Sequence, residues 1–389
     1  MVISMNIEKL YKYLPINNID WNLIENELLH PFVKNMKETM QEAKWHGEGD
    51  VWTHTKMVCE ELIKLNEYQE LPKAMKLVVF LAALFHDIAK PVCTKIIDGE
   101  IRSFKHPATG ALITRNYLWK ELGLSGKKEY QEFREAISLL VRYHSEPTYL
   151  DYEDNKEKLV IKLSLNSNLT KYFNNKLLAL LATSDIKGRI SDTNEEKLSV
   201  VEEFKQLAIN LNCYENSFKF NNTHTKIKYL ENDNVWYQDS LYDSTWGEVI
   251  LICGLPGTGK DTYIKKHYPN HKIISLDDIR EKYKIKPTEN QGEVYNIAKD
   301  EAKSYLRQHI SFVWNATNIT KMIRDKQIKL FHEYGARVKV IFLETEYQEM
   351  LKRNNNRKRY VSEKVINDML EKLEIIEDFE AEIVEWICI

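Results

Sequence analysis

The chain has 389 residues, of which 43% are hydrophobic and 29% charged, and its formal net charge at pH 7 is -3. This length predicts two or three domains, each long enough for its own core. The near balance of charges excludes a global basic field for nucleic acid, so any site for a polyanion must be local.

The five cysteines form no CxxC pair, so we expect buried, reduced thiols. No apolar stretch approaches the roughly 20 residues of a membrane span, and the N-terminus begins no secretory signal. These features predict a cytoplasmic protein that does not act at a membrane.

Residues 1–215 are predicted to form an all-α domain. Apolar residues recur at helical spacing over 52–65, 75–85, 133–143 and 177–182, whereas strand-like alternation is nearly absent. Residues 216–246 show no long amphipathic pattern, and we expect a linker or a small β-rich connector there.

Residues 247–389 are predicted to form an α/β domain with a parallel sheet. Short apolar runs at 249–253, 272–275, 312–315 and 338–343 are typical of buried strands, and helical patterns separate them. Such alternation of strand and helix indicates a parallel sheet with helices on both faces.

A phosphate-binding loop follows the first of these strands. The motif Gly254-x-x-x-x-Gly259-Lys260 lies between a predicted strand and a predicted helix, which is the context that such a loop requires. Glycines let main-chain N–H groups curl around phosphate oxygens, while the helix N-terminus and Lys260 add positive potential. We therefore expect a nucleoside triphosphate, with ATP as donor and Mg²⁺ beside it. The expected contacts are Gly254, Pro256, Gly257, Thr258, Gly259, Lys260, Asp261 and Thr262.

Asp261 departs from the commonest pattern, because a Ser or Thr normally holds Mg²⁺ at this position. A carboxylate beside a triphosphate is repelled unless a divalent cation intervenes. The hydroxyl comes one residue later, and this spacing resembles that of adenylate kinases and related small P-loop kinases. Thr262 is therefore the preferred metal or phosphate contact. Asp261 is expected either to lie at the nucleotide site with a divalent cation beside it or to face a neighbouring loop.

The segment Ser275-Leu276-Asp277-Asp278-Ile279-Arg280 ends the second predicted strand, at the sheet edge where ligands bind. A carboxylate there can take the proton of an attacking hydroxyl while Arg280 holds an acceptor phosphate. The other interpretation is a helix N-cap. We expect one of Asp277 and Asp278 to cap the helix and the other to be free for chemistry.

Residues 353–359 are basic and polar and precede a helix. Most such runs are solvated surface. Here the run follows the last predicted strand and a helix, where P-loop kinases carry a mobile lid whose arginines neutralise phosphoryl charge.

Together these residues resemble the 5′-hydroxyl polynucleotide kinases of nucleic-acid repair. The resemblance covers residues 247–389, and the S-x-D-D-x-R element and the lid make it more specific than the loop alone. It implies Asp277 as general base and Arg280 as the ligand of the acceptor's phosphate. It also implies that Lys260 binds the ATP phosphates and that Arg353 and Arg357 are the lid arginines.

His86 and Asp87 follow an apolar helix, where two polar side chains are costly to bury unless they are paired or bound to metal. Other candidate ligands, each on or beside a predicted helix, are His54, His106, His144 and Asp185. Such a mixture of nitrogen and oxygen ligands suits Mn²⁺, Fe, Co²⁺, Ni²⁺ or Zn²⁺ rather than Ca²⁺.

The segments 45–54 and 84–91 are similar to the HD phosphohydrolase superfamily, particularly to the HD domains attached to bacterial tRNA nucleotidyltransferases. The similarity spans residues 40–190 and implies the ligand order H…HD…H…H…D. The order maps to His54, His86, Asp87, His106, His144 and Asp185. Six ligands imply two metals bridged by Asp87, and one metal if His106 or His144 does not take part.

Two metals would activate a water and neutralise the charge of a phosphoester. In this resemblance Lys90, one turn past the ligands, would hold a phosphate oxygen. His46 would protonate a leaving group, and its alternative is an ordinary loop residue.

An HD phosphohydrolase followed by a 5′-hydroxyl kinase resembles the bacterial HD-Pnk family of end-healing enzymes. The resemblance implies removal of a 2′,3′-cyclic phosphate or a 2′- or 3′-phosphate, and ATP-dependent phosphorylation of a 5′-OH. DNA or RNA ends would be the substrate, with a functional link to a ligase. The sequence leaves the choice of nucleic acid, the native metal and the oligomeric state open.

Two other classes of function compete with this interpretation. One is a nucleoside or nucleotide kinase fused to an HD nucleotidase or phosphodiesterase that acts on small molecules. The other is a non-catalytic nucleotide-dependent switch, which ranks last because a switch has no use for the carboxylate and the lid.

Overall fold

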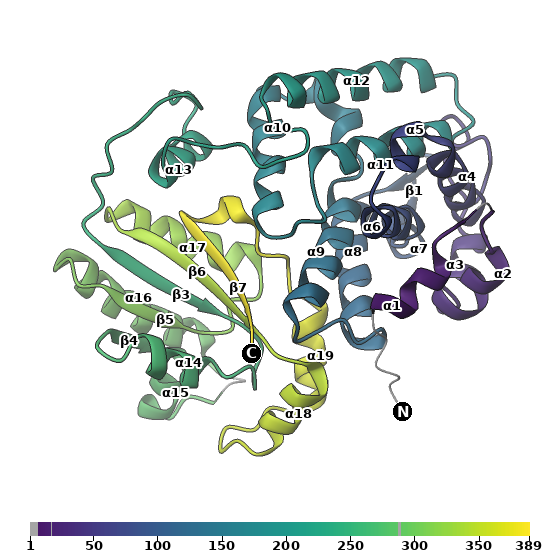
Figure 1. The fold of residues 1–389 in the computed structure, drawn as a ribbon. Helices are drawn as coiled ribbons and strands as arrows, with labels where there is room; N and C mark the ends of the chain where they lie inside the picture. Colours follow the sequence, from purple (N-terminus) through teal and green to yellow (C-terminus); the bar gives the residue numbers. More distant parts are fainter. Residues whose placement is uncertain (1–6, 17, 287–288) are drawn as a thin grey trace. The chain divides into compact units, whose positions relative to one another are not determined.

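The computed structural model describes residues 7–16, 18–286 and 289–389, and the chain divides into two compact units. The first unit comprises Met1–Leu124 and Glu129–Phe218, and the second comprises Ser125–Lys128 and Lys219–Ile389. The first is helical and the second is built around an open sheet (Figure 1).

The first unit holds most of the helices of the chain. They are α1 (Ile7–Leu10), η1 (Tyr11–Tyr13), α2 (Trp21–Leu23), η2 (Ile24–Leu28), α3 (Val33–Glu38), α4 (Val51–Lys64), α5 (Asn66–Gln69), α6 (Lys73–Phe85), α7 (Lys90–Cys93), α8 (His106–Asn116), η3 (Tyr117–Glu121), α9 (Lys128–Tyr143), η4 (Glu146–Tyr152), α10 (Lys156–Leu165), η5 (Asn166–Asn168), α11 (Asn175–Lys187) and α12 (Asn194–Asn210). Helix α4 begins at Val51 because the Asp50 carboxylate accepts hydrogen bonds from two N–H groups of the first turn. Helix α6 forms the centre of the core, since every residue from 77 to 85 is buried.

A two-stranded antiparallel hairpin interrupts the helices of the first unit. It pairs β1 (Thr94–Ile97) with β2 (Glu100–Ser103). Asp98 and Gly99 join the strands and both have positive φ, 54° and 84°, as a two-residue hairpin turn requires. The all-helical prediction for this region omitted the hairpin, although an Asp-Gly pair is its usual sequence signal.

The segment that was expected to be a linker or a β-rich connector contains a helix. All residues from 216 to 247 are described, and they form α13 (Thr223–Glu231) and no strand, so the β-rich alternative is wrong. Lys226 on α13 is buried, and its Nζ donates hydrogen bonds to the carbonyl oxygens of Asp378 (2.9 Å) and Glu382 (3.3 Å). These bonds attach the helix to the second unit.

The second unit contains a five-stranded sheet in which all neighbouring strands are parallel. Its strands are β3 (Glu248–Cys253), β4 (Lys272–Ser275), β5 (Phe312–Asn315), β6 (Arg337–Glu344) and β7 (Ile383–Cys388), in the spatial order β4-β5-β3-β6-β7. The four predicted strands are present at their expected positions. The fifth, β7, was not predicted, because it is a partly exposed strand at the sheet edge with no continuous apolar run.

Helices cover both faces of this sheet, as the alternation of strand and helix predicts. They are α14 (Lys260–His267), α15 (Leu276–Tyr283), α16 (Gln291–Arg307), α17 (Lys321–Glu333), α18 (Tyr347–Asn355), α19 (Glu363–Glu371) and η6 (Asp378–Glu380). On one face Ile264 of α14 packs with Ile250 and Ile252 of the central strand. On the other face Phe331 of α17 packs against Phe312 and Trp314 of β5, with ring centroids 5.6 and 6.0 Å apart.

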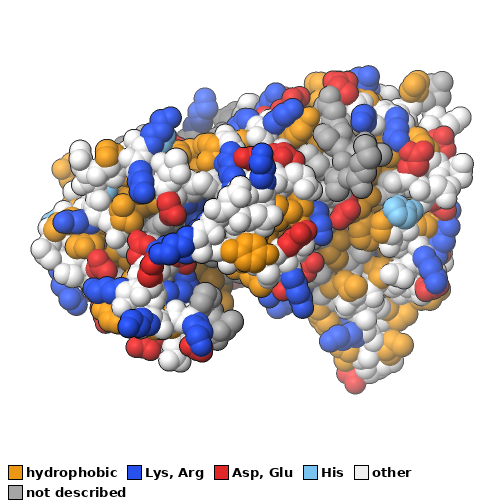
Figure 2. Space-filling model, turned by 90° about the horizontal axis from the view of Figure 1, so that it is seen from below, with side chains coloured by type: hydrophobic (Ala, Val, Ile, Leu, Met, Phe, Trp, Pro, Cys, Tyr) orange, Lys and Arg blue, Asp and Glu red, His pale blue; other side chains and the backbone are white. Residues whose placement is uncertain are grey.

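The surface carries charges of both signs, in keeping with the small net charge. On the face that Figure 2 shows, lysine and arginine side chains are interspersed with aspartate and glutamate. Among the described residues, no helix is both long enough and apolar enough to cross a bilayer. All five cysteines are free thiols, and Cys59, Cys213 and Cys253 are buried.

Candidate active sites

The phosphate loop has a backbone that only glycine adopts easily. Gly254, Gly257 and Gly259 have φ angles of 143°, 87° and 86°. A Cβ atom at Gly254 would lie 2.7 Å from the Leu343 carbonyl oxygen, and one at Gly257 would lie 2.5 Å from that of Met350. The loop is therefore wound tightly between the ends of β3, β6 and α18, and α14 starts directly after it.

Lys260 lies over this loop, and its Nζ donates to the carbonyl oxygens of Gly254 and Leu255, both at 3.0 Å. Burial lowers the pKa of Lys260 to about 8, and Arg357 also lowers it, while the carboxylates of Asp261 and Asp277 oppose the shift. The charges that act on this pKa thus include those of the predicted base Asp277 and the predicted lid residue Arg357. Pro256, Gly257 and Thr258 of the loop are buried.

Asp261 and Thr262 lie at the start of α14, and both are exposed. Asp261 Oδ1 accepts a hydrogen bond from Asn315 Nδ2 at 2.8 Å. Asn315 is the last residue of β5, so in this structure Asp261 faces the end of a strand rather than a loop.

The residues that follow β4 lie at the same edge of the sheet as the phosphate loop. Ser275 pairs in register with Asn315, which in turn pairs with Ile252, so the three strands end at one level. Asp277 comes two residues later, and its Oδ1 accepts a hydrogen bond from Arg280 Nη1 at 2.6 Å. The Asp277 side chain is 53% exposed, so its carboxylate is open to an incoming acceptor.

The N-cap of α15 differs from the expectation. Ser275 is the cap, and its Oγ accepts the hydrogen bond of the Asp278 N–H at 3.2 Å. Neither Asp277 nor Asp278 caps the helix, because it begins one residue earlier than the pair. Both carboxylates therefore lie within the first turn, where the helix dipole favours negative charge.

The predicted lid is formed by the end of α18 and the loop before α19. Arg353 on α18 is paired with Glu349 at 2.9 Å, and a side chain at Gly259 would come within 3.7 Å of the Arg353 guanidinium. Farther along, Arg359 pairs with Asp278 (2.8 Å) and with Glu281 of α15. The structure thus brings the loop, Asp277 and Arg280, and the basic segment to one edge of the sheet.

The predicted metal ligands of the first unit come from five helices or helix ends. His54 lies on α4, His86 and Asp87 follow α6, His106 begins α8, His144 follows α9, and Asp185 lies on α11. All are buried except His106, which is partly exposed.

These side chains converge on Asp87 and Asp185. The Nε2 atoms of His86 and His106 lie 3.3 Å from Asp87 Oδ2 and Oδ1, respectively. His54 Nε2 lies 3.0 Å from Asp185 Oδ1 and 3.7 Å from Asp87 Oδ2. Donor atoms of His54, His86 and Asp87 lie within 4.8 Å of one another, and so do those of Asp87, His106 and His144. Asp87 is common to both groups, the position expected of a bridging carboxylate.

Main-chain carbonyl groups orient three of the imidazoles. Their Nδ1 atoms lie 2.7 to 2.8 Å from a carbonyl oxygen three residues earlier, as seen for His86 to Ala83, His106 to Ser103 and His144 to Val141. A carbonyl oxygen only accepts, so each Nδ1 carries a proton, and Nε2 is the nitrogen that a metal would use. Burial lowers the pKa of His144 to about 3, and a neutral imidazole is the form that binds metal.

Glu48 orients the fourth imidazole and was not predicted. Its buried carboxylate lies 2.8 Å from His54 Nδ1 and 2.9 Å from His46 Nδ1, and it accepts the Ile190 N–H at 2.9 Å. Carboxylates that hold the outer nitrogen of a metal-binding histidine are common. The sequence signal was the acidic residue between two glycines in Gly47-Glu48-Gly49.

Two cations lie beside the carboxylates of the centre. Lys90 Nζ is 2.7 Å from Asp87 Oδ2 and donates to Gln41 Oε1 at 2.5 Å. Arg189, which was not predicted, pairs with both oxygens of Asp185. Although burial raises the pKa of a carboxyl group, His86 and Lys90 hold that of Asp87 well below its usual range, and Arg189 and His54 do the same for Asp185.

His46 lies next to this centre in the neutral form. Burial lowers its pKa to about 4, Glu48 opposes this shift, and Lys90 adds to it. A general acid must carry a proton, so in the free protein His46 is better described as a hydrogen-bond partner of Glu48. Its role as an acid stays a prediction.

The residues present fit the metals that the sequence implies. Both oxygens of Asp87 are buried, and within the described part of the chain neither accepts a hydrogen bond of good geometry. Buried imidazole nitrogens facing such a carboxylate form a donor set for transition metals. His54, His86, Asp87 and Asp185 would hold one ion, and Asp87, His106 and His144 a second.

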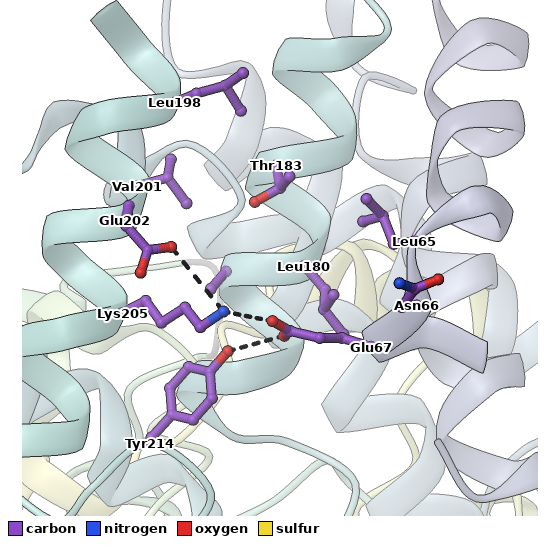
Figure 3. Close-up of a pocket in the computed structure, with 11 residues that line it drawn as sticks. Leu65, Asn66, Glu67, Leu180, Thr183, Leu198, Val201, Glu202, Lys205 and Tyr214 are labelled. Atoms are coloured by element: carbon purple, nitrogen blue, oxygen red, sulfur yellow. Dashed lines mark hydrogen bonds and ion pairs between the residues drawn. The ribbon is translucent and has the colours of Figure 1, made fainter. Parts of the chain in front are cut away.

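A separate cavity of about 320 Å³ lies in the first unit, where α5, α11 and α12 meet. Figure 3 shows Lys205 reaching Glu67, whose carboxylate also accepts a hydrogen bond from the Tyr214 hydroxyl at 3.2 Å. None of the predicted site residues lines this cavity.

Comparisons with protein families match both units. A family model described as an HD domain matches residues 51–165, and one described as an AAA domain matches residues 249–376. A search of curated proteins found no match to the chain. The expected fold class, an HD-type helical domain followed by an α/β P-loop kinase domain, is confirmed.

Both domains are of types typical of enzymes, a metal-dependent hydrolase and a P-loop kinase. The first implies divalent metal, and the second implies ATP with Mg²⁺. Asp185 lies beyond the residues that the HD match covers, and in the structure its carboxylate contacts the predicted ligand His54.

Proposed function

We propose that the protein heals nucleic-acid ends with two active sites. The second unit would transfer phosphate from ATP to a 5′-OH end, and the first would remove a 2′,3′-cyclic phosphate or a 2′- or 3′-phosphate. The observation that carries the proposal is the placement of Asp277 and Arg280 just after β4, at the sheet edge where the phosphate loop emerges.

In the kinase site, Asp277 accepts the proton of the attacking hydroxyl, because its exposed carboxylate lies near the lysine that binds the donor phosphates. Arg280 keeps this carboxylate oriented and has further N–H groups for a phosphate on the acceptor. Lys260, Arg353 and Arg357 neutralise charge on the transferring group. ATP supplies the phosphoryl group when it is bound.

In the hydrolase site, the buried imidazoles and the two aspartates hold their positions without rearrangement, since carbonyl groups, Glu48 and Arg189 orient them. Lys90 is close enough to Asp87 to neutralise a phosphate oxygen beside it. Metal ions bound there supply an activated water.

A polynucleotide acceptor fits the open kinase site better than a small molecule does. Asp277 is half-exposed and Arg280 lies beside it, whereas a pocket for a small ligand typically buries most of that ligand's surface. Arg280 also has the side chain that commonly grips a phosphate backbone. A nucleoside or nucleotide kinase fused to an HD nucleotidase is the competing function.

One oligonucleotide tests both halves of the proposal. It carries a 5′-OH and a 2′,3′-cyclic phosphate and is incubated with ATP, Mg²⁺ and either Mn²⁺ or Ni²⁺. We expect the 5′ end to gain a phosphate and the 3′ end to lose its own. Phosphorylation of free nucleosides in preference to the oligonucleotide would favour the small-molecule function. No phosphate transfer to either acceptor would contradict the kinase.

A further inference from the structure

The exposed large aromatic residues of the first unit lie close to the predicted metal ligands in the sequence. In the described part of that unit, the exposed large aromatic residues are Trp45, Phe104, Tyr149 and Tyr152. Trp45 adjoins His46, Phe104 is two residues before His106, and the tyrosines follow His144 on η4. Single exposed aromatic residues are ordinary, but their concentration around a candidate site marks a binding surface.

Hydrogen bonds tie the Trp45 loop to the rim of the centre. Gly47 N donates to the Ile190 carbonyl oxygen at 2.9 Å, and Ile190 N donates to Glu48 at 2.9 Å. Arg189, one residue earlier, pairs with Asp185. The segment from Arg189 to Ile190 therefore connects the exposed tryptophan loop directly to the predicted metal ligands.

The two tyrosines share one cation. Lys197 Nζ lies 5.3 Å from the ring centroids of both Tyr149 and Tyr152, and it also donates to the Thr148 carbonyl oxygen at 3.3 Å. The ring centroids are 5.9 Å apart, and the side chains are 53% and 75% exposed. Each ring thus contacts the lysine and the other ring, while both tyrosines stay largely exposed to solvent.

Lysines lie beside three of these aromatic rings, although the exposed carboxylates of Glu153 and Asp154 follow Tyr152 in the sequence. Lys197 lies between the tyrosines, and Lys44 Nζ lies 4.6 Å from the Trp45 ring. Asp151, which lies between the tyrosines in the sequence, is already paired with Lys156 at 2.6 Å. Aromatic faces combined with cations are the usual means of binding single-stranded nucleic acid, because every base has a face to stack.

We propose that Tyr149, Tyr152 and Lys197 form a stacking platform for the unpaired bases next to the phosphate that the histidine centre removes. The proposal rests on the proposed function and deepens it, since it assigns a binding surface to the strand beside the reacting end. The platform binds bases without reading their sequence, so it accepts any single-stranded end.

The test compares two phosphate esters in wild type and in the variants Tyr149→Ala and Tyr152→Ala. One ester is a single-stranded oligonucleotide with a 3′-phosphate, and the other is glycerol 2-phosphate, which has no base. Each alanine variant should lower kcat/KM for the oligonucleotide by about tenfold, mainly through KM, because the stacking of one base is lost. Hydrolysis of glycerol 2-phosphate should stay at the wild-type rate.

Three controls make the test specific. Tyr149→Phe and Tyr152→Phe keep the ring and should keep the oligonucleotide activity. Tyr242→Ala removes a tyrosine that is 88% exposed in the second unit and should change neither ester's hydrolysis. Metal content of each variant, measured by elemental analysis, should equal that of wild type.

Two results would overturn the platform. One is unchanged oligonucleotide hydrolysis in both alanine variants, and the other is an equal loss on both esters, which indicates a structural role. A wild-type protein that hydrolyses glycerol 2-phosphate but not the oligonucleotide would overturn the hydrolase half of the proposed function itself. The wild-type comparison therefore separates the two failures.

Discussion

The phosphate loop is one continuous segment, from Gly254 to Lys260, whereas the histidine centre draws its side chains from positions between Glu48 and Arg189. The loop presents main-chain groups to its ligand. At three positions with positive φ it has glycine, which carries no side chain. The histidine centre presents side chains whose orientation depends on other residues. A substitution in the loop should therefore have a local effect, whereas a substitution in the centre should also disturb the residues that contact it.

The largest effect is expected from Asp87→Asn. The substitution removes the carboxylate that both ligand groups share, so phosphoesterase activity should fall by roughly 10³-fold or more, equivalent to about 4 kcal/mol. Bound transition metal, measured by elemental analysis, should fall with it, and kinase activity should stay unchanged. Unchanged metal content would contradict the ligand set.

The reciprocal experiment is Asp277→Asn in the kinase site. Loss of the proton acceptor should lower 5′-OH phosphorylation by roughly 10²-fold or more. Metal content and phosphoesterase activity should match the wild type, since the histidine centre uses other residues. If both activities fell together, the assumption of two independent sites would be wrong. Wild-type behaviour would favour a nucleotide-dependent switch.

Glu48→Gln tests whether the histidine centre depends on its supporting residues. The amide keeps the shape but loses the charge that holds His54, so metal affinity should weaken by about 10- to 100-fold. A titration of metal into the metal-free protein measures this. Glu61→Gln, on the partly exposed face of α4, is the control and should bind metal normally.

The affinity of the kinase site for ATP should depend on pH through Lys260 of the phosphate loop. Because burial lowers the pKa of Lys260 to about 8, its ammonium form is present below pH 8 and is lost above it. KM for ATP should therefore rise by about tenfold per pH unit above pH 8, as the charged fraction falls. Lys260→Arg keeps the charge at every pH tested and should flatten the profile, even where its activity is lower.

The smallest effect on activity is expected from a substitution at Gly126, which is far from the phosphate loop in the sequence. Gly126 has a φ of 73°, donates its N–H to Glu344 at 2.8 Å, and would place a Cβ atom 2.6 Å from the Glu346 Cα within the second unit. Gly126→Ala should cost about 2 kcal/mol of stability and lower the Tm of that unit. Gly99→Ala has a similar φ, 84°, but meets nothing within 4 Å. It should cost less, and an equal cost would show that contact with Glu346 is not the cause.

Much of the fold follows from local patterns in the sequence. Four strands and four helices of the first unit, α4, α6, α9 and α11, were predicted close to their observed positions, because apolar periodicity reports which face is buried. The longest helix of that unit, α12, was not among the predicted segments. The hairpin at Asp98 and Gly99 and the edge strand β7 were missed. Both are short and partly exposed, so they leave little apolar pattern.

By itself the sequence determined the phosphate loop. The spacing of its glycines and the lysine that follows are all within one short segment, so the loop needs no residue from elsewhere in the chain. It also indicated His86 and Asp87, which follow an apolar helix, whereas the other ligands of the centre were identified through resemblance to a family. Only the tertiary structure decided that Ser275 caps α15, that Asp261 faces Asn315, and that Glu48 and Arg189 orient His54 and Asp185. The physical reason is that these contacts join residues brought together by packing, where geometry rather than spacing along the chain selects the partner.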